Sequence, residues 1–252
     1  MRWLDALVFS SLWVAATAAA LCRASAPAMG AAPDAAVVGL AFCGTLLVYN
    51  VDRLRDLARD RVTSPARSRF VEEHRGALLG LSVAAGAGSA GLAFAVGPTG
   101  IAALLPIALL GFFHRRLKRF GWWKPFYVSA AWCGVTVGLP AVTAAAPRHV
   151  TWVAAIVAIT LAGNVIASNL RDGEAWSVRF GARVPLRVAR GCAALGLLLA
   201  GLAPPPVRPL AAIPGATLLA LLFFRPDERY GLVVVDGALL VGALSALPWY
   251  AA

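Results

Sequence analysis

Apolar blocks alternate with short charged segments along the whole of this 252-residue chain. The blocks are roughly 16–24 residues long, close to the ~20 that an α-helix needs to cross a bilayer. The pattern predicts an all-α fold, a polytopic membrane helix bundle with about nine transmembrane helices in a single transmembrane domain, residues 1–252. The predicted spans are residues 3–22, 35–51, 76–96, 98–113, 125–146, 150–169, 188–203, 207–224 and 231–249.

Composition agrees with an integral membrane protein. The chain is 60% hydrophobic and only 14% charged, with a mean hydropathy of +0.75, whereas a soluble domain carries about 25% charged residues. The four cysteines form no CxxC pair, so we expect them to act as small buried hydrophobic residues. The abundance of Ala, Arg, Gly and Pro suggests a bacterial protein, and therefore the inner (plasma) membrane.

Basic residues mark alternate loops. Twenty of the 23 Lys and Arg residues are Arg2 or lie in the segments 52–75, 114–124, 170–190 and 225–230. Because cytoplasmic loops carry the excess of Lys and Arg, these segments and the amino terminus are predicted to be cytoplasmic, and the carboxyl terminus external. This topology explains the net charge of +11 without a nucleic-acid partner.

Carboxylates gather in two of these cytoplasmic segments, although topology does not require them there. Asp52, Asp56 and Asp60 are spaced four residues apart, and they share one face if the helix of the second span continues inward. Two interpretations stay open. The interleaved arginines neutralise the carboxylates, or the carboxylates bind a divalent cation such as Mg²⁺, which commonly binds through one or two carboxylates plus substrate phosphates.

A second polar segment favours the cation. Asn164, Ser168 and Asn169 precede Asp172 and Glu174 on a helix predicted to leave the membrane at the same face. Polar residues within a span are functional candidates, and amide and carboxylate oxygens both suit a hard cation. We expect the two segments to face each other across one Mg²⁺–diphosphate site, with Arg and Lys side chains holding the phosphate oxygens.

Asp236 lies within the last predicted span, in the sequence GLVVVDGALLVG. A single carboxylate at that depth needs a partner or water. It either shapes a pocket for an acceptor substrate or pairs with a polar group on another helix, and the sequence leaves both interpretations open.

These motifs resemble those of the UbiA superfamily of intramembrane prenyltransferases, which have nine transmembrane helices and two Asp-rich cytoplasmic motifs. The first, N/D-x3-D-x3-D followed by N-x-P-x-R, is similar to Asp52, Asp56 and Asp60 followed by Pro65 and Arg67, with Thr63 in place of the Asn. The second, D-x2-D-x-E-x-D followed by a Pro, is similar to Asn169, Asp172, Glu174 and Pro185. A lysine-bearing loop is matched by Leu117, Lys118 and Arg119.

The resemblance implies an enzyme that transfers a polyprenyl group from its diphosphate to an aromatic or other lipophilic acceptor within the membrane. It implies Mg²⁺ as the cofactor, and a polyprenyl diphosphate donor, a lipophilic acceptor and membrane lipid as partners. The catalytic aspartates would be Asp52, Asp56, Asp60 and Asp172, and the metal ligands would be these four with Asn169 and Glu174. The implied diphosphate-binding residues are Arg67, Lys118 and Arg171.

One departure supports an alternative function. Trp176 occupies the place of the last Asp in the second motif, and Asn169 the place of the first. A second hypothesis is therefore a non-catalytic relative that binds or carries isoprenoid lipids. A CDP-alcohol phosphotransferase fits less well, since its signature fails after Asp172 and Gly173. A transporter lacks a visible repeat with paired broken helices.

Overall fold

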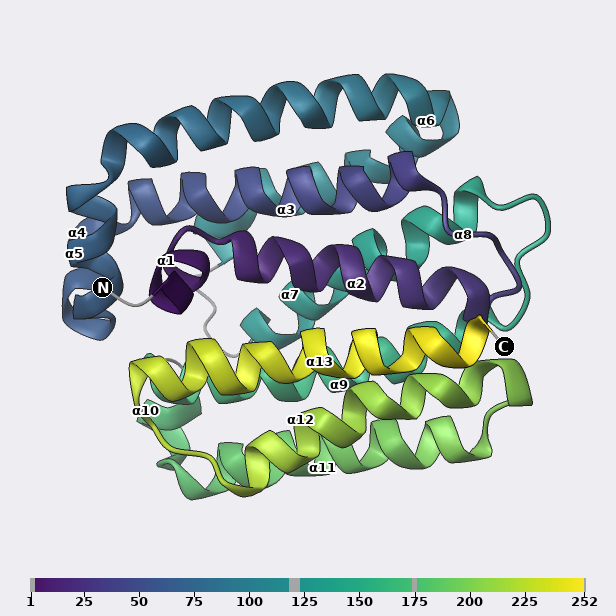
Figure 1. The fold of residues 1–252 in the computed structure, drawn as a ribbon. Coiled ribbons are helices and arrows are strands. Elements are labelled where there is room, and N and C mark those ends of the chain that lie inside the picture. The colour runs from purple at the N-terminus through teal and green to yellow at the C-terminus, as the bar shows by residue number, and fades with distance from the viewer. Residues whose placement is uncertain (1–2, 118–122, 174–175, 252) are drawn as a thin grey trace.

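The chain forms a bundle of roughly aligned helices, shown in Figure 1. The computed structural model describes residues 3–117, 123–173 and 176–251, and these residues contain no β-strand. The α-helices are α1 (Trp3–Phe9), α2 (Leu12–Ala28), α3 (Ala35–Arg55), α4 (Leu57–Thr63), α5 (Pro65–Glu73), α6 (Arg75–Leu117), α7 (Lys124–Cys133), α8 (Leu139–Thr143), α9 (Val150–Arg171), α10 (Trp176–Phe180), α11 (Arg183–Leu202), α12 (Ala212–Leu222) and α13 (Asp236–Ala246). Gly134–Gly138 (η2) and Tyr230–Val235 (η4) are π-helical, and Pro205–Ala211 (η3) and Leu247–Tyr250 (η5) are 3₁₀-helical.

The all-α membrane fold is confirmed. Among the described residues, seven helices are long and apolar enough to cross a membrane, or eight if the bent pair α1–α2 forms one span. The predicted span 98–113 lies in the second part of α6 and is not among those seven. The predicted boundary before it is real, because Gly97 interrupts α6 with φ 83° and ψ −177°, a conformation that favours glycine.

The first predicted span, 3–22, is not one continuous helix. α1 ends at Phe9, and α2 begins at Leu12 with its axis turned by 70°. Ser11 adopts the left-handed conformation between them, with φ 65°, and its hydroxyl donates a 2.7 Å hydrogen bond to Asn50 Oδ1 on α3. A long-range contact with α3 therefore accompanies the break, which local hydropathy does not reveal.

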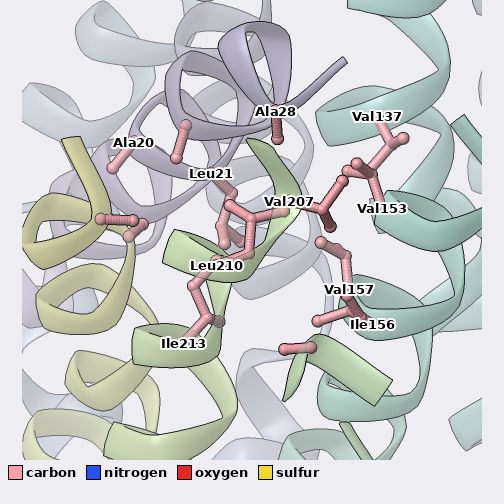
Figure 2. Close-up of a cluster of buried hydrophobic side chains, with 14 of the residues drawn as sticks. Ala20, Leu21, Ala28, Val137, Val153, Ile156, Val157, Val207, Leu210 and Ile213 are labelled. Atoms are coloured by element: carbon pink, nitrogen blue, oxygen red, sulfur yellow. The ribbon is translucent and has the colours of Figure 1, made fainter. Parts of the chain in front are cut away.

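The main apolar core lies where α2, α9, α13 and the segment 205–213 meet. Figure 2 shows Leu21, Val153, Ile156, Leu210 and Ile213 within this cluster. Small residues allow the backbones to approach closely. At Gly163, for example, an added Cβ would lie 2.8 Å from the carbonyl oxygen of Ala189. The core aligns α9 and α13, whose polar residues form one side of the candidate site.

The two ends of the helix bundle differ in the short helices and in the chain terminus that lie there. α1, α4, α5 and α10 lie at the end that holds the amino terminus, and the carboxyl terminus lies at the opposite end (Figure 1). Both acidic segments therefore belong to the same end of the bundle. Which end faces the cytoplasm stays a prediction from the basic loops.

Candidate functional site

The first acidic segment spans a break between two helices. α3 ends at Arg55, and Asp56 lies between α3 and α4 with φ −96° and ψ 11°, away from the helical ψ near −42°. The helix of the second span continues inward only to Arg55, so the condition under which Asp52, Asp56 and Asp60 would share one helix face is not met. Main-chain hydrogen bonds still link the positions, from Asp56 N to Asp52 O at 2.9 Å and from Asp60 N to Asp56 O at 3.0 Å.

An ion pair joins α4 to α5. Arg67 Nη2 donates to Asp60 Oδ2 at 2.9 Å, and both side chains are mostly buried, at 11% and 20% exposure. Pro65 begins α5, where its missing N–H costs nothing and its fixed φ suits a helix. The structure thus pairs Arg67 with the first acidic segment, and its expected contact with diphosphate stays a prediction.

The second segment lies at the end of α9. Arg171 donates to both carboxylate oxygens of Asp172, from Nε at 2.7 Å and from Nη2 at 3.1 Å. Arg171 Nη1 is 3.8 Å from Asp236 Oδ2 on α13. The arginine, predicted to hold diphosphate, thus already links two carboxylates.

The ionisation of Asp172 reflects this environment. Burial alone raises the pKa of its carboxyl group, but the charge and hydrogen bonds of Arg171, with smaller contributions from Lys124 and Arg67, lower the pKa below its ordinary value. Asp172 is therefore a carboxylate at neutral pH. Arg67, which pairs with Asp60, thus makes only a small contribution to the pKa of Asp172.

Asp236 has partners on a neighbouring helix. Besides Arg171, it accepts a 3.5 Å hydrogen bond from the Ser168 hydroxyl. Asn164 Nδ2 donates to the carbonyl oxygen of Val235, next to Asp236, at 3.0 Å. These contacts support the interpretation that Asp236 pairs with polar groups between helices, and a role in an acceptor pocket stays a prediction.

Several buried polar atoms among the described residues have no hydrogen-bond partner. They include both side-chain polar atoms of Asn169, which is 1% exposed, together with Arg67 Nε and Arg171 Nη1. Such atoms are costly to bury unless they bind something. The amide oxygen of Asn169 suits a cation or its water shell, and the two guanidinium nitrogens suit anionic oxygens.

The described part of the chain contains no group of three His, Cys, Asp or Glu residues placed to hold a metal ion by itself. Binding of Mg²⁺ by one or two of the carboxylates together with a diphosphate stays a prediction. Asp52 and Asp56 both have interaction partners in the structure. Lys118 and Glu174, which the sequence assigns to diphosphate and metal, lie outside the described residues.

Three long-range contacts of this end were missed by sequence reasoning. Arg53 is 6% exposed and donates to the carbonyl oxygens of Val8 and Phe9, at 3.1 and 2.6 Å. Glu228 accepts hydrogen bonds from two amides at the start of α5, and its neighbour Arg229 pairs with Asp5 at 3.0 Å. Arg53 and Asn50 share a helix face by their i, i+3 spacing, but no sequence signal names their partners.

Comparison with known proteins identifies one solved structure with a similar fold. No family model matches the chain, and no curated protein matches it. Among solved structures, it is similar to a digeranylgeranylglyceryl phosphate synthase, with a TM-score of 0.50 and 14% identity. The match covers 95% of this chain and 99% of that one.

The chain shares the overall fold of that synthase. The resemblance expected from the motifs is confirmed at the level of the fold, over nearly the full length of both chains. With seven or more apolar helices, the chain is an integral membrane protein.

Proposed function

We propose that this chain is a Mg²⁺-dependent membrane prenyltransferase that moves a polyprenyl group from its diphosphate to an aromatic or other lipophilic acceptor. The observation that carries the proposal is Arg67, which pairs with Asp60 while its buried Nε has no hydrogen-bond partner among the described residues. The two acidic segments, about 110 residues apart in sequence, belong to the same end of the bundle (Figure 1), as a shared metal–diphosphate site would require. The prenyltransferase fold supports the same function.

The chain's own residues supply anion binding in this proposal. Arg67 Nε and Arg171 Nη1 have no hydrogen-bond partner among the described residues. They would donate to diphosphate oxygens and stabilise the negative charge that grows on the leaving group. Asp52, Asp56, Asp60, Asn169 and Asp172 would hold Mg²⁺, which when bound neutralises part of the diphosphate charge.

The proposed transfer breaks the bond between the allylic carbon of the donor and the diphosphate oxygen. The electron pair leaves with the diphosphate, and the allylic carbon gains positive charge. A nucleophilic atom of the acceptor forms the new bond to that carbon and loses a proton. The apolar helices would keep water from the cationic carbon during this step.

The same proposal gives the chain an orientation. The amino terminus and the end carrying α4, α5 and α10 would face the cytoplasm of a bacterium, because 20 of 23 basic residues belong to that side of the predicted topology. The carboxyl terminus would lie outside the plasma membrane.

A second candidate, binding or transport of isoprenoid lipid without catalysis, is favoured by one feature. Both oxygens of Asp172 are occupied by Arg171, and Trp176 replaces a carboxylate of the second motif. A cation would have to displace this ion pair to use Asp172. In the non-catalytic protein the pair would persist, and diphosphate would bind without Mg²⁺ or not at all.

The deciding experiment measures binding of geranylgeranyl diphosphate to purified protein in detergent, with and without Mg²⁺. We expect binding that requires Mg²⁺ and is lost in Asp56→Ala. Glu73→Ala, which removes an exposed carboxylate at the end of α5, should bind normally. Binding that does not depend on Mg²⁺, or that is retained in Asp56→Ala, would support the lipid-binding alternative.

A further inference from the structure

The loop between α12 and η4, residues 223–229, contacts α5, which lies far from it in the sequence. Glu228 Oε1 accepts a hydrogen bond from the main-chain N–H of Arg67 at 2.9 Å. Glu228 Oε2 accepts one from the N–H of Ala66 at 3.2 Å. Both carboxylate oxygens therefore bind the first turn of α5, across 161 and 162 positions of sequence.

The start of α5 has no cap of its own. Ser64 occupies the N-cap position but has φ −145° and ψ 67°, and its side chain makes no capping hydrogen bond. Pro65 has no N–H to donate. A helix begins with unpaired N–H groups and a partial positive charge, and a carboxylate satisfies both. Glu228 therefore acts as the cap that the local sequence does not provide.

The loop that carries Glu228 is anchored on a second side. Arg229 Nη2 pairs with Asp5 Oδ1 of α1 at 3.0 Å. The main chain also closes locally, where Asp227 Oδ1 accepts from the N–H of Tyr230 at 2.8 Å. Glu228 is therefore presented to α5 by a loop held at α1 and at the start of η4.

The Glu228 cap binds the main chain of Arg67. The main-chain N–H of Arg67 is bound by Glu228, while its side chain bonds to Asp60 at 2.9 Å and its buried Nε has no hydrogen-bond partner among the described residues. Glu228 therefore binds the main chain of a residue whose side chain is assigned to the diphosphate.

We propose that Glu228 is a positioning residue that fixes the first turn of α5 and so holds the Arg67 guanidinium at Asp60, with its buried Nε available to an anion. The functional meaning of Arg67 rests on the function proposed above, but the capping contact does not. Without Glu228, the first turn of α5 would open more often, and Arg67 would spend less time in its binding position.

Two measurements on the full-length protein in detergent test this role in Glu228→Ala, Glu228→Gln and the control Glu73→Ala. The first is hydrogen exchange of the amides in residues 65–73, without ligand. The second is affinity for inorganic pyrophosphate. In Glu228→Ala we expect faster exchange at the start of α5 and pyrophosphate affinity lower by roughly 2- to 30-fold, the range expected from a lost helix cap.

The conservative variant and a double-mutant cycle separate positioning from general damage. Glu228→Gln keeps one acceptor oxygen, so it should recover part of both effects. Arg67→Ala in the Glu228→Ala background should cost less affinity than in the wild type, because Glu228→Ala has already weakened the contact of the Arg67 guanidinium with pyrophosphate. Glu73→Ala should match the wild type in both measurements.

Unchanged exchange at the start of α5 in Glu228→Ala would overturn the proposal, as would full additivity with Arg67→Ala. Tighter pyrophosphate binding in Glu228→Ala would also overturn it, because Glu228 would then compete with the ligand. A wild-type protein that binds no pyrophosphate would count against the proposed function alone. The exchange measurement would then still decide whether Glu228 holds α5.

Discussion

Arg53 on α3 donates a 2.6 Å hydrogen bond to the carbonyl oxygen of Phe9, the last residue of α1. The same nitrogen donates to the carbonyl oxygen of Val8 at 3.1 Å. The last carbonyls of a helix have no partner within it and carry partial negative charge, which a cation satisfies. A buried arginine among the Asp-rich residues thus ends the first helix and holds it against α3.

Arg53→Ala should lower stability much more than Arg55→Ala. The first variant leaves two carbonyl oxygens without their charged donor, at a cost of about 1.5–3 kcal/mol in the free energy of unfolding. Arg55 is two residues away and exposed. Arg55→Ala therefore measures the effect of removing one positive charge without removing a buried hydrogen bond. Thermal unfolding in detergent would measure both, and equal melting temperatures would contradict a structural role for Arg53.

Arg67→Lys should weaken pyrophosphate binding by about tenfold, the equivalent of one charge-assisted hydrogen bond. Arginine can bond to Asp60 through Nη2 while Nε stays available to an anion, whereas a single ammonium group cannot reproduce that planar fork. Arg69→Lys, on the exposed side of the same helix, is the matched control. Titration calorimetry would measure the affinities, and equal losses in the two variants would refute the distinction.

Arg171→Gln should change how stability depends on pH. In the wild type the lowered pKa of Asp172 means that its carboxylate contributes stability above the ordinary pKa of 3.8, and loses it as the pH falls through the lower folded value. Without Arg171, burial shifts the pKa of Asp172 upward, so this contribution shrinks or reverses. The stability difference between the two proteins should therefore grow as the pH rises from about 3 to 6.

Thermal unfolding at several pH values between these limits would measure that difference. Asp172→Asn provides the control, because Arg171→Gln added to it removes only the longer 3.8 Å contact with Asp236 and should give a difference that depends less on pH. A constant difference between wild type and Arg171→Gln would show that the ion pair does not set the ionisation of Asp172.

Gly231→Ala should displace Arg171. Gly231 lies in η4, and a Cβ at this position would collide with the side chain of Arg171. We expect a loss of roughly 1–3 kcal/mol in the free energy of unfolding from overpacking, with weaker pyrophosphate binding. Gly191→Ala on α11 meets open space and should be neutral or stabilising, since alanine favours a helix. Comparable behaviour of the two variants in melting and binding would contradict this packing argument.

Hydropathy and charge determined the membrane-embedded helical architecture. Most predicted spans lie within a few residues of the observed helices, such as 150–169 within Val150–Arg171, and the boundary before residue 98 falls at Gly97. These features depend on local composition, because a helix in lipid satisfies its own main-chain hydrogen bonds whatever its neighbours are. The ion pair between Asp60 and Arg67, seven residues apart, was not predicted from their spacing.

The tertiary structure alone decided which polar groups meet. Arg53 bonds to a residue 44 positions earlier, Glu228 to one 161 positions earlier, and Asp236 pairs with Arg171. The break at Asp56 likewise interrupts the helix that would have carried all three aspartates on one face. Side-chain pairs between distant segments form only after apolar packing has aligned the helices, so their partners are set by three-dimensional contact and cannot be read from local pattern.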